Sequence, residues 1–192
     1  EFWSGWFDKW GAQHETRPAK DMVEGMDEML SKGISFSLYM THGGTSFGHW
    51  AGANSPGFAP DVTSYDYDAP INEAGQTTSK FWTLRKAMEK YSGTWNPTTG
   101  KWEGSAKLPA VPKEYPTIAV PKFELKEFKP LVYGCDSIAK GGGLTTFEEM
   151  NMGWGSMMYE TTLPEIPVQS ILKLDAHDYA QVFVNGKFVG KI

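Results

Sequence analysis

One pattern constrains the fold of this chain more than any other: a helix-type repeat that runs, after a single glycine, into a strand-type repeat. Apolar residues recur at helical spacing across residues 18–32, with a proline suited to the first turn and Gly33 suited to the C-terminal cap. Across residues 34–40, apolar side chains alternate with small or polar ones, as in a strand with one buried face. This order predicts an α/β architecture of repeated β–α units, in which loops at the carboxyl ends of the strands carry the chemistry.

A second helix is predicted over residues 79–91, where apolar side chains again fall at helical spacing. Its apolar face would carry Phe81, Leu84, Met88 and Tyr91. Residues 41–78, which precede this helix, are aromatic and rich in Gly, Asn and Pro, without a sustained period. Because long loops inside compact domains are usually functional or disordered, the aromatic content of this one predicts an ordered, functional loop.

The composition changes near Asn96, where the chain becomes rich in Pro, Lys and Gly. We therefore place a domain boundary there and expect a first domain over residues 1–95. Residues 96–130 would form a linker with one or two short strands. Residues 131–192 would form part of an all-β domain, and no internal repeat is evident.

Strand patterns support the all-β assignment of the last part of the chain. Strands are predicted at residues 156–163, 170–174 and 179–184. The pair Asn185 and Gly186 stands between two apolar segments, where a two-residue type I′ hairpin turn requires positive φ at both positions. A hairpin is therefore expected at this point.

Charge and cysteine usage restrict the partners. A net charge of -5, a pI near 5.4 and the absence of a basic run argue against nucleic acid or an anionic membrane surface as partner, and favour a small neutral ligand. Cys135 is the single cysteine and cannot form an internal disulfide. His42 and His49, even with Asp66, are too weak a pattern to predict a metal site. No apolar run reaches the ~20 residues of a membrane span, and a first residue other than Met indicates an excised piece.

The first eleven residues, EFWSGWFDKWG, place a carboxylate among large aromatic side chains. An ionised Glu1 is costly to desolvate without compensating hydrogen bonds, so aromatics beside it indicate a specific use. Carbohydrate sites combine aromatic faces for the sugar ring with carboxylates for its hydroxyls and reacting carbon. If the first two strands are neighbours, Tyr39 at the end of the second would lie near Glu1 and near Tyr67 of the YDYDAP segment.

Three blocks of the sequence resemble the β-galactosidases of glycoside hydrolase family 35, in order and at matching intervals: EFWSGWFDKWG, LYMTHGGTSFGHWAGAN and TSYDYDAPINEAGQ. The resemblance is specific over residues 1–91 and weaker over residues 133–192. It implies the last two βα units of an eight-unit (β/α) TIM barrel, followed by the start of a β-sandwich domain. The implied activity is the removal of terminal β-galactosyl residues with retention, and the implied ligand is galactose or a β-galactoside.

The same resemblance assigns roles to residues. Glu1 matches the catalytic nucleophile, Tyr39 and Tyr67 match tyrosines that line the galactose pocket, and Trp6 matches a tryptophan of the pocket wall. Trp3 stands where relatives often have tyrosine, and we include it as a substrate-binding residue. No metal or organic cofactor is implied. By analogy with the family, an exported location is expected.

One part of the family pattern is missing. The general acid/base of the family is a Glu in an Asn-Glu pair on an earlier strand, and no such block precedes the nucleophile position here. Asp66 and Asp68 could replace it, but carboxylates in such a segment more often stabilise the loop by accepting backbone N–H bonds. We therefore expect the isolated chain to show no turnover. A non-catalytic carbohydrate-binding module is the alternative interpretation.

Overall fold

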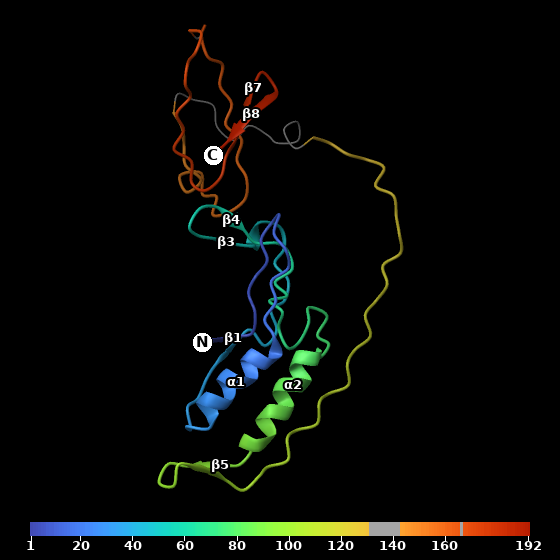
Figure 1. The fold of residues 1–192 in the computed structure, drawn as a ribbon. Helices are drawn as coiled ribbons and strands as arrows, with labels where there is room; N and C mark the ends of the chain where they lie inside the picture. The colour runs from blue at the N-terminus through green and yellow to red at the C-terminus, as the bar shows by residue number, and fades with distance from the viewer. Residues whose placement is uncertain (131–142, 166) are drawn as a thin grey trace. The chain divides into compact units, whose positions relative to one another are not determined.

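A computed structural model describes residues 1–130, 143–165 and 167–192 of the chain (Figure 1). The chain divides into two compact units, Glu1–Ala119 and Val120–Ile192. Among the described residues the strands form four separate two-stranded sheets, and no closed barrel is present. In the same part of the chain, no helix has the length and apolar character needed to cross a membrane.

The first unit is built on a β–α–β arrangement. Strand β1 (Phe2–Trp3) pairs in parallel with β2 (Leu38–Tyr39), and helix α1 (Ala19–Leu30) lies between them in sequence. The predicted first helix and the predicted neighbouring strands are therefore confirmed. The strand predicted over residues 34–40 is much shorter in the structure. Only Leu38 and Tyr39 pair with a neighbouring strand, because β1 supplies just two partner residues.

Helix α1 ends as its sequence predicts. Gly33 adopts a φ of 68°, and the amide of Ile34 donates to the carbonyl of Met29 at 2.9 Å, which is the bond of a Schellman-type ending. A side chain at Gly33 would also meet the ring of Trp95, with its Cβ only 2.2 Å from the nearest ring atom. Both the turn and the close approach of Trp95 therefore require glycine here.

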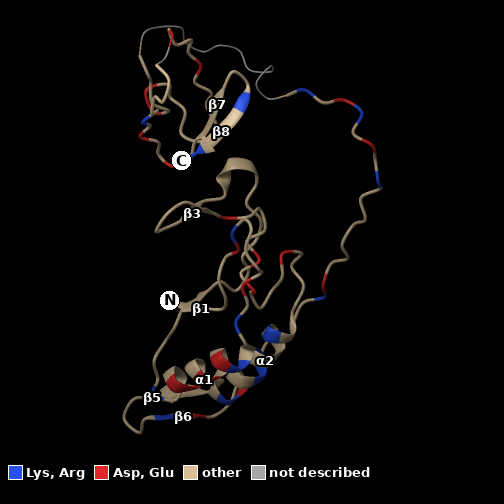
Figure 2. Ribbon diagram, turned by 45° about the horizontal axis from the view of Figure 1, so that its top comes forward, with Lys and Arg blue, Asp and Glu red and all other residues tan. Residues whose placement is uncertain are grey.

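Helix α2 (Ser79–Met88) packs beside α1, and a short 3₁₀ turn, η2 (Glu89–Tyr91), completes the predicted second helix (Figures 1 and 2). The shared core contains Met22, Met26 and Leu84. The predicted apolar face is correct at Leu84 but wrong at Met88, whose side chain is 43% exposed. The buried side chain near the start of the helix belongs instead to Lys80, which the periodic pattern did not indicate.

A hairpin of β5 (Thr94–Asn96) and β6 (Lys101–Glu103) follows α2. The indole of Trp102 donates to the carbonyl of Leu30 at 2.7 Å, so the hairpin covers the end of α1. The predicted short strands after residue 96 are represented by this hairpin, which packs within the first unit. The domain limits at residues 95 and 130 themselves stay predictions.

The loop of residues 41–78 contains a 3₁₀ turn, η1 (Gly48–Trp50), and a short antiparallel pair, β3 (Ala53–Asn54) with β4 (Ala59–Pro60). Isolated bridges add cross-links within the loop, including Thr45 with Ser64. The loop is thus ordered, as its aromatic content predicts.

Within its described residues, the second unit contains one hairpin, β7 (Gln181–Val184) with β8 (Lys187–Lys191). Asn185 and Gly186 have φ values of 49° and 74°, which confirms the predicted turn. The strands predicted at 156–163 and 170–174 are not strands among the described residues. Their alternation expresses only a local preference, and no segment in the described parts of the chain pairs with them. Cys135 lies outside the described residues.

Candidate functional site

Six aromatic side chains gather beyond the carboxyl ends of β1 and β2: Trp3, Trp6, Phe7, Tyr39, Tyr65 and Tyr67. We call this set the aromatic cluster. They come from β1 and the loop after it, from the end of β2, and from the loop of residues 41–78. Neighbouring ring centroids lie 5.0–6.3 Å apart, within the range of favourable aromatic pairs. The structure therefore brings together all four aromatic residues that the sequence nominated.

Glu1 lies at the edge of this cluster. Its carboxylate Oε2 accepts a hydrogen bond from the indole Nε1–H of Trp3 at 2.9 Å. Glu1 directly precedes β1, which begins at Phe2. The negative charge of Glu1 acts on the cluster, since it contributes to raising the pKa of Tyr67. The Glu1 carboxylate and the Tyr67 phenol are therefore electrostatic neighbours.

Two phenols of the cluster, those of Tyr65 and Tyr67, stay neutral at physiological pH. Burial, followed by the electrostatic influence of the neighbouring Tyr39 and Glu1, raises the pKa of Tyr67 to about 12. Burial and the hydrogen bond with Tyr39 raise the pKa of Tyr65 well above its ordinary value, and the two hydroxyl oxygens lie 3.1 Å apart. Neutral phenols are hydrogen-bond donors.

The cluster has an accessible part and a buried part. Trp3 is 46% exposed, and Trp6 and Tyr39 are each 36% exposed, so these three rings offer faces to a ligand. Tyr67 is only 3% exposed and lies behind them. Its contacts with Trp6 and Tyr39, at 6.3 and 5.4 Å between ring centroids, make it the support of the exposed rings.

The turn that carries Tyr67 is held from several sides. Tyr67 and Asp68 both have positive φ, at 61° and 48°, a conformation that costs about 1–2 kcal/mol for each residue that is not glycine. Gly5 lets the carbonyl of Tyr67 approach its backbone closely. The carboxylate of Asp68 accepts from the backbone amide of Arg17 at 2.7 Å and from the ammonium of Lys80 at 2.5 Å. Asp68 thus stabilises the loop, as expected of an Asp in such a segment.

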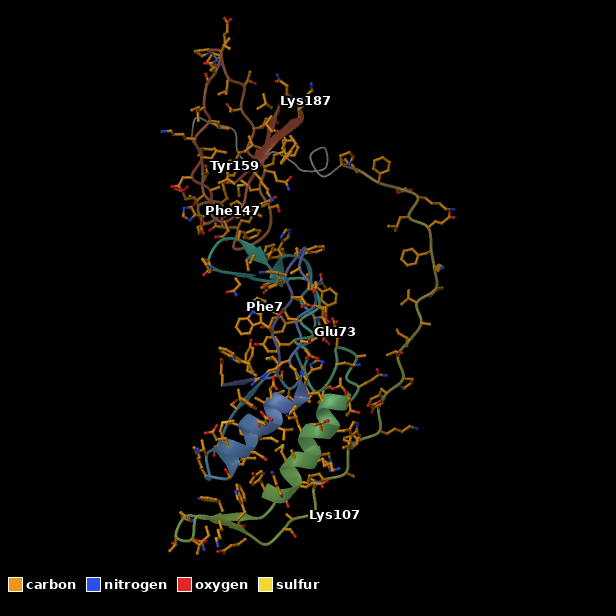
Figure 3. The ribbon with its side chains drawn as sticks, in the orientation of Figure 1. Phe7, Glu73, Lys107, Phe147, Tyr159 and Lys187 are labelled. Atoms are coloured by element: carbon orange, nitrogen blue, oxygen red, sulfur yellow. The ribbon has the colours of Figure 1, made fainter. Side chains whose placement is uncertain are left out.

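Other carboxylates near the cluster are engaged in structural contacts. The sequence has one Asn-Glu pair, and its Glu73 accepts from Ser64 at 2.6 Å and from Thr45 (Glu73 is labelled in Figure 3). These bonds lower the pKa of Glu73, which favours the ionised form over a proton donor. Asp66 lies 3.7 Å from the Nε2 of His14. Among the described residues, no group of His, Cys, Asp and Glu is arranged to hold a metal ion.

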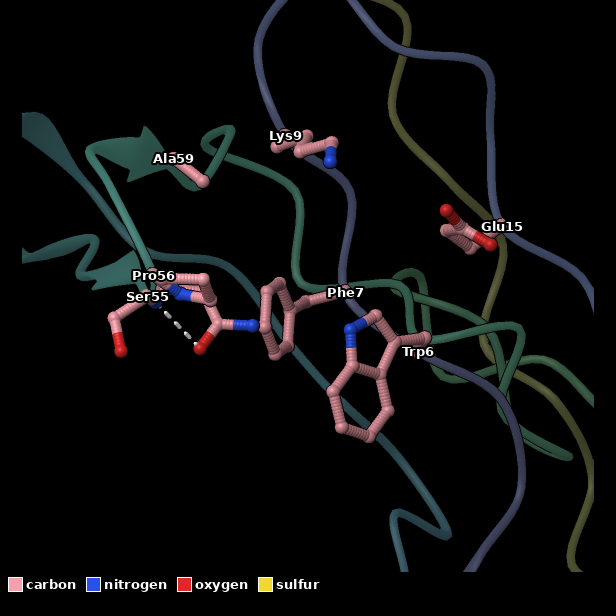
Figure 4. A pocket seen from close by; sticks show the side chains of 8 residues that line it. Trp6, Phe7, Lys9, Glu15, Ser55, Pro56 and Ala59 are labelled. Carbon is pink, nitrogen blue, oxygen red and sulfur yellow. Dashed lines mark hydrogen bonds between the residues drawn. The ribbon is translucent and has the colours of Figure 1, made fainter.

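A cavity of about 170 Å³ adjoins the aromatic cluster (Figure 4). Its walls combine two aromatic rings with polar and charged groups: Trp6, Phe7, Lys9, Glu15, Asn54, Ser55, Pro56 and Ala59. Trp6 and Phe7 stack at 5.0 Å and belong to both the cluster and the cavity. The cavity is smaller than the 300–1,000 Å³ typical of drug-sized ligand sites. It has room for only part of a ligand.

Sequence reasoning missed three residues of this site. Tyr65 stands two residues before Tyr67, and that spacing could have placed both on one side of an extended segment. Phe7 adjoins Trp6 in the opening block (Figure 4). Lys80 gave no signal, because a lysine on a helix is ordinarily exposed.

A carboxylate beside exposed indoles and phenols is the arrangement of a carbohydrate site, and hydrolysis of glycosides uses such carboxylates. Residues 1–91 match the model of the glycosyl hydrolases family 35. The chain belongs to this family of glycoside hydrolases.

Relatives extend the similarity beyond residue 91. The chain is 35% identical to human "Beta-galactosidase" over 97% of its own length, which is 27% of the relative. It is 34% identical to "Beta-galactosidase" of Xanthomonas manihotis over 100% of the chain and 31% of the relative. Identity to mouse "Beta-galactosidase-1-like protein" is 32% over 99% of the chain and 29% of the relative. The chain thus spans less than a third of the length of these relatives.

Proposed function

We propose that this chain supplies the nucleophile side of the galactose site in a retaining β-galactosidase, as the last two βα units of a TIM barrel and the start of a following β domain. The observation that carries the proposal is the Glu1 carboxylate, held by the Trp3 indole beside the aromatic cluster. The names of the relatives support the substrate class. Galactose or a β-galactoside is the ligand.

In the proposed reaction, a carboxylate oxygen of Glu1 attacks the anomeric carbon while the bond to the leaving oxygen breaks. The leaving oxygen takes a proton from a separate carboxylic acid. Water then attacks the galactosyl-Glu1 ester, and galactose departs with its configuration retained. The Trp3 N–H orients the attacking carboxylate through its hydrogen bond to Oε2.

The remaining residues would bind the sugar. The exposed faces of Trp6 and Tyr39 suit the apolar C–H face and the hydroxyls of galactose, while Tyr67 fixes both rings from behind. None of these groups is a proton donor to the leaving oxygen. Glu73 is a poor one, because its pKa is lowered. We therefore propose that the acid lies elsewhere and that the isolated chain does not turn over ordinary galactosides.

An activated substrate tests the nucleophile without the acid. A 2-deoxy-2-fluoro-β-galactoside with a dinitrophenolate leaving group needs no proton on departure, so it should form a stable ester on Glu1 that mass spectrometry of the N-terminal peptide detects. The Glu1→Ala variant should stay unlabelled. The control Glu24→Gln, an exposed residue of α1, should label as the unmodified protein does. Labelling of Glu1→Ala, or a label on another residue, would refute the assignment.

The alternative, a carbohydrate-binding module, predicts a different location for galactose. In an NMR titration with galactose, a module should show its largest shift changes in residues 143–192. The proposed site should show them at Trp3, Trp6 and Tyr39 instead. Shift changes confined to the second unit would favour the module.

A further inference from the structure

Lys80 is a buried lysine whose ammonium is fully satisfied. Only 6% of the residue is exposed. The Nζ donates to the carbonyl of Ser4 at 2.8 Å, to the carbonyl of Asp68 at 2.6 Å and to the carboxylate of Asp68 at 2.5 Å. An ammonium has three N–H donors, and each has an acceptor here.

These contacts join three segments that carry the site. Lys80 belongs to the first turn of α2, Ser4 directly follows β1, and Asp68 directly follows Tyr67. Ser4 is itself fully buried, and its hydroxyl donates to the carbonyl of Met40, just after β2, at 2.6 Å. One ammonium therefore links the end of β1, and through Ser4 the end of β2, to the turn that holds Tyr67.

The link fixes distances within the aromatic cluster. The carbonyl of Ser4 is three residues from Glu1 and one from Trp3, whereas the carbonyl of Asp68 is one residue from Tyr67. Because both carbonyls bind the same nitrogen, the distances from the Tyr67 ring to Tyr39 and to the Glu1 carboxylate are restricted. No other described side chain bonds both segments at once: Arg17 bonds Trp3 and Asp68 through separate groups, its side chain and its backbone amide.

We propose that Lys80 is a positioning residue of the galactose site: it touches no substrate and acts by holding the Tyr67 turn against the end of β1. The ligand in this proposal rests on the proposed function, whereas the contacts of Lys80 come from the structure. Loss of the ammonium leaves the carbonyls of Ser4 and Asp68 without this donor and the Asp68 carboxylate with only the Arg17 amide, so the turn moves and the rings in front of Tyr67 lose their support.

The test compares Lys80→Met with Lys86→Met, which removes an exposed lysine from the same helix. In the protein that carries this sequence, we expect Lys80→Met to weaken galactose binding on the order of tenfold or more, as for a displaced positioning group. Lys86→Met should bind as the unmodified protein does. Circular dichroism establishes that each variant is folded.

A second readout reports the position of Tyr67 without any ligand. In a titration followed by NMR of tyrosine labelled at Cζ, Lys80→Met should lower the pKa of Tyr67 from about 12 toward the ordinary 10, because the ring becomes solvated. Tyr91, whose hydroxyl contacts Asp27 rather than this turn, serves as an internal control. If Lys80→Met does not fold, Asp68→Asn keeps two of the three acceptors in full and should show both effects in weaker form.

The outcomes separate the two proposals. Failure of the unmodified protein to bind galactose would refute the proposed function, while the Tyr67 titration still tests the position. Equal galactose affinity and an equal Tyr67 titration in Lys80→Met and Lys86→Met would overturn the role of Lys80. Loss of stability alone, with both readouts unchanged, would overturn it as well.

Discussion

Replacement of Gly5 by alanine tests whether the loop after β1 and the Tyr67 turn are packed as closely as the structure indicates. A Cβ at Gly5 would lie 2.0 Å from the carbonyl oxygen of Tyr67 and 3.0 Å from the Cβ of Asp68. Ordinary contact begins at 3.4 Å, so the carbonyl would have to retreat by 3.4 minus 2.0, or about 1.4 Å. The obstacle is backbone, which no rotamer change can relieve.

The cost follows from that displacement. Overpacking a well-packed region costs about 1–3 kcal/mol. Tyr67 and Asp68 already hold positive φ values, so little further distortion is available to them, and we expect the upper end, about 3 kcal/mol. Gly52→Ala is the matched control: its Cβ would meet Asp61 at 3.7 Å, an ordinary contact, and should change stability by less than about 0.5 kcal/mol.

Urea unfolding of the two variants measures the difference, with circular dichroism in the near ultraviolet to follow the aromatic cluster. Gly5→Ala should unfold at clearly lower urea and lose part of its aromatic signal before the helices melt. Gly52→Ala should follow the unmodified chain. Coincident unfolding curves for Gly5→Ala and Gly52→Ala would show that the Tyr67 carbonyl does not pack on Gly5.

Three further changes have defined outcomes. Thr78→Ala removes the side-chain cap of α2, where the Oγ1 of Thr78 accepts from the amide of Phe81 at 3.3 Å. Chemical denaturation should show an unfolding free energy lower by about 1 kcal/mol. An unchanged denaturation midpoint would contradict the role of Thr78 as a cap. The hydrogen bond with Asp8 raises the pKa of His14 above 6.5, so its stabilisation is complete below pH 6.5 and is lost as pH rises through the higher folded value. The difference in unfolding free energy between the unmodified chain and His14→Gln should therefore shrink from about pH 5.5 to about pH 8.5, and a difference that grows would refute this. Asn185→Val places a β-branched residue at a φ of 49° and should therefore weaken the β7–β8 hairpin. The measurement is faster amide hydrogen exchange at Val182 and Gly190, which pair with each other. The control Lys187→Val should leave these exchange rates unchanged.

Helices could be predicted from this sequence because their information is local. The spacing of Met22, Met26 and Leu30 and the glycine at 33 place α1 almost to the residue. Strands were predicted less well, because alternation marks a preference while hydrogen bonding needs a partner. Only Leu38–Tyr39 of the alternating segment 34–40 finds one, in Phe2–Trp3.

The candidate site, too, could be predicted only in part. Aromatic residues near a carboxylate could be nominated from the sequence, and Trp3, Trp6, Tyr39 and Tyr67 do converge. Their roles toward a sugar stay predictions. What holds them could not be foreseen: the buried ammonium of Lys80 meets Ser4, 76 positions earlier, a pairing that only the folded backbone creates.

The bond between Trp102 and Leu30 has a kinetic consequence. The carbonyl of Leu30 at the end of α1 accepts locally from the amide of Gly33 at 3.0 Å, and it receives a second donor from Trp102, 72 positions downstream, only when the β5–β6 hairpin has docked. Closing so large a loop is an entropic barrier that local helix formation does not face. We therefore expect the Trp102 contact with the end of α1 to form late during refolding, observed as quenching or shift of the Trp102 emission, after the amides of the helix are already protected.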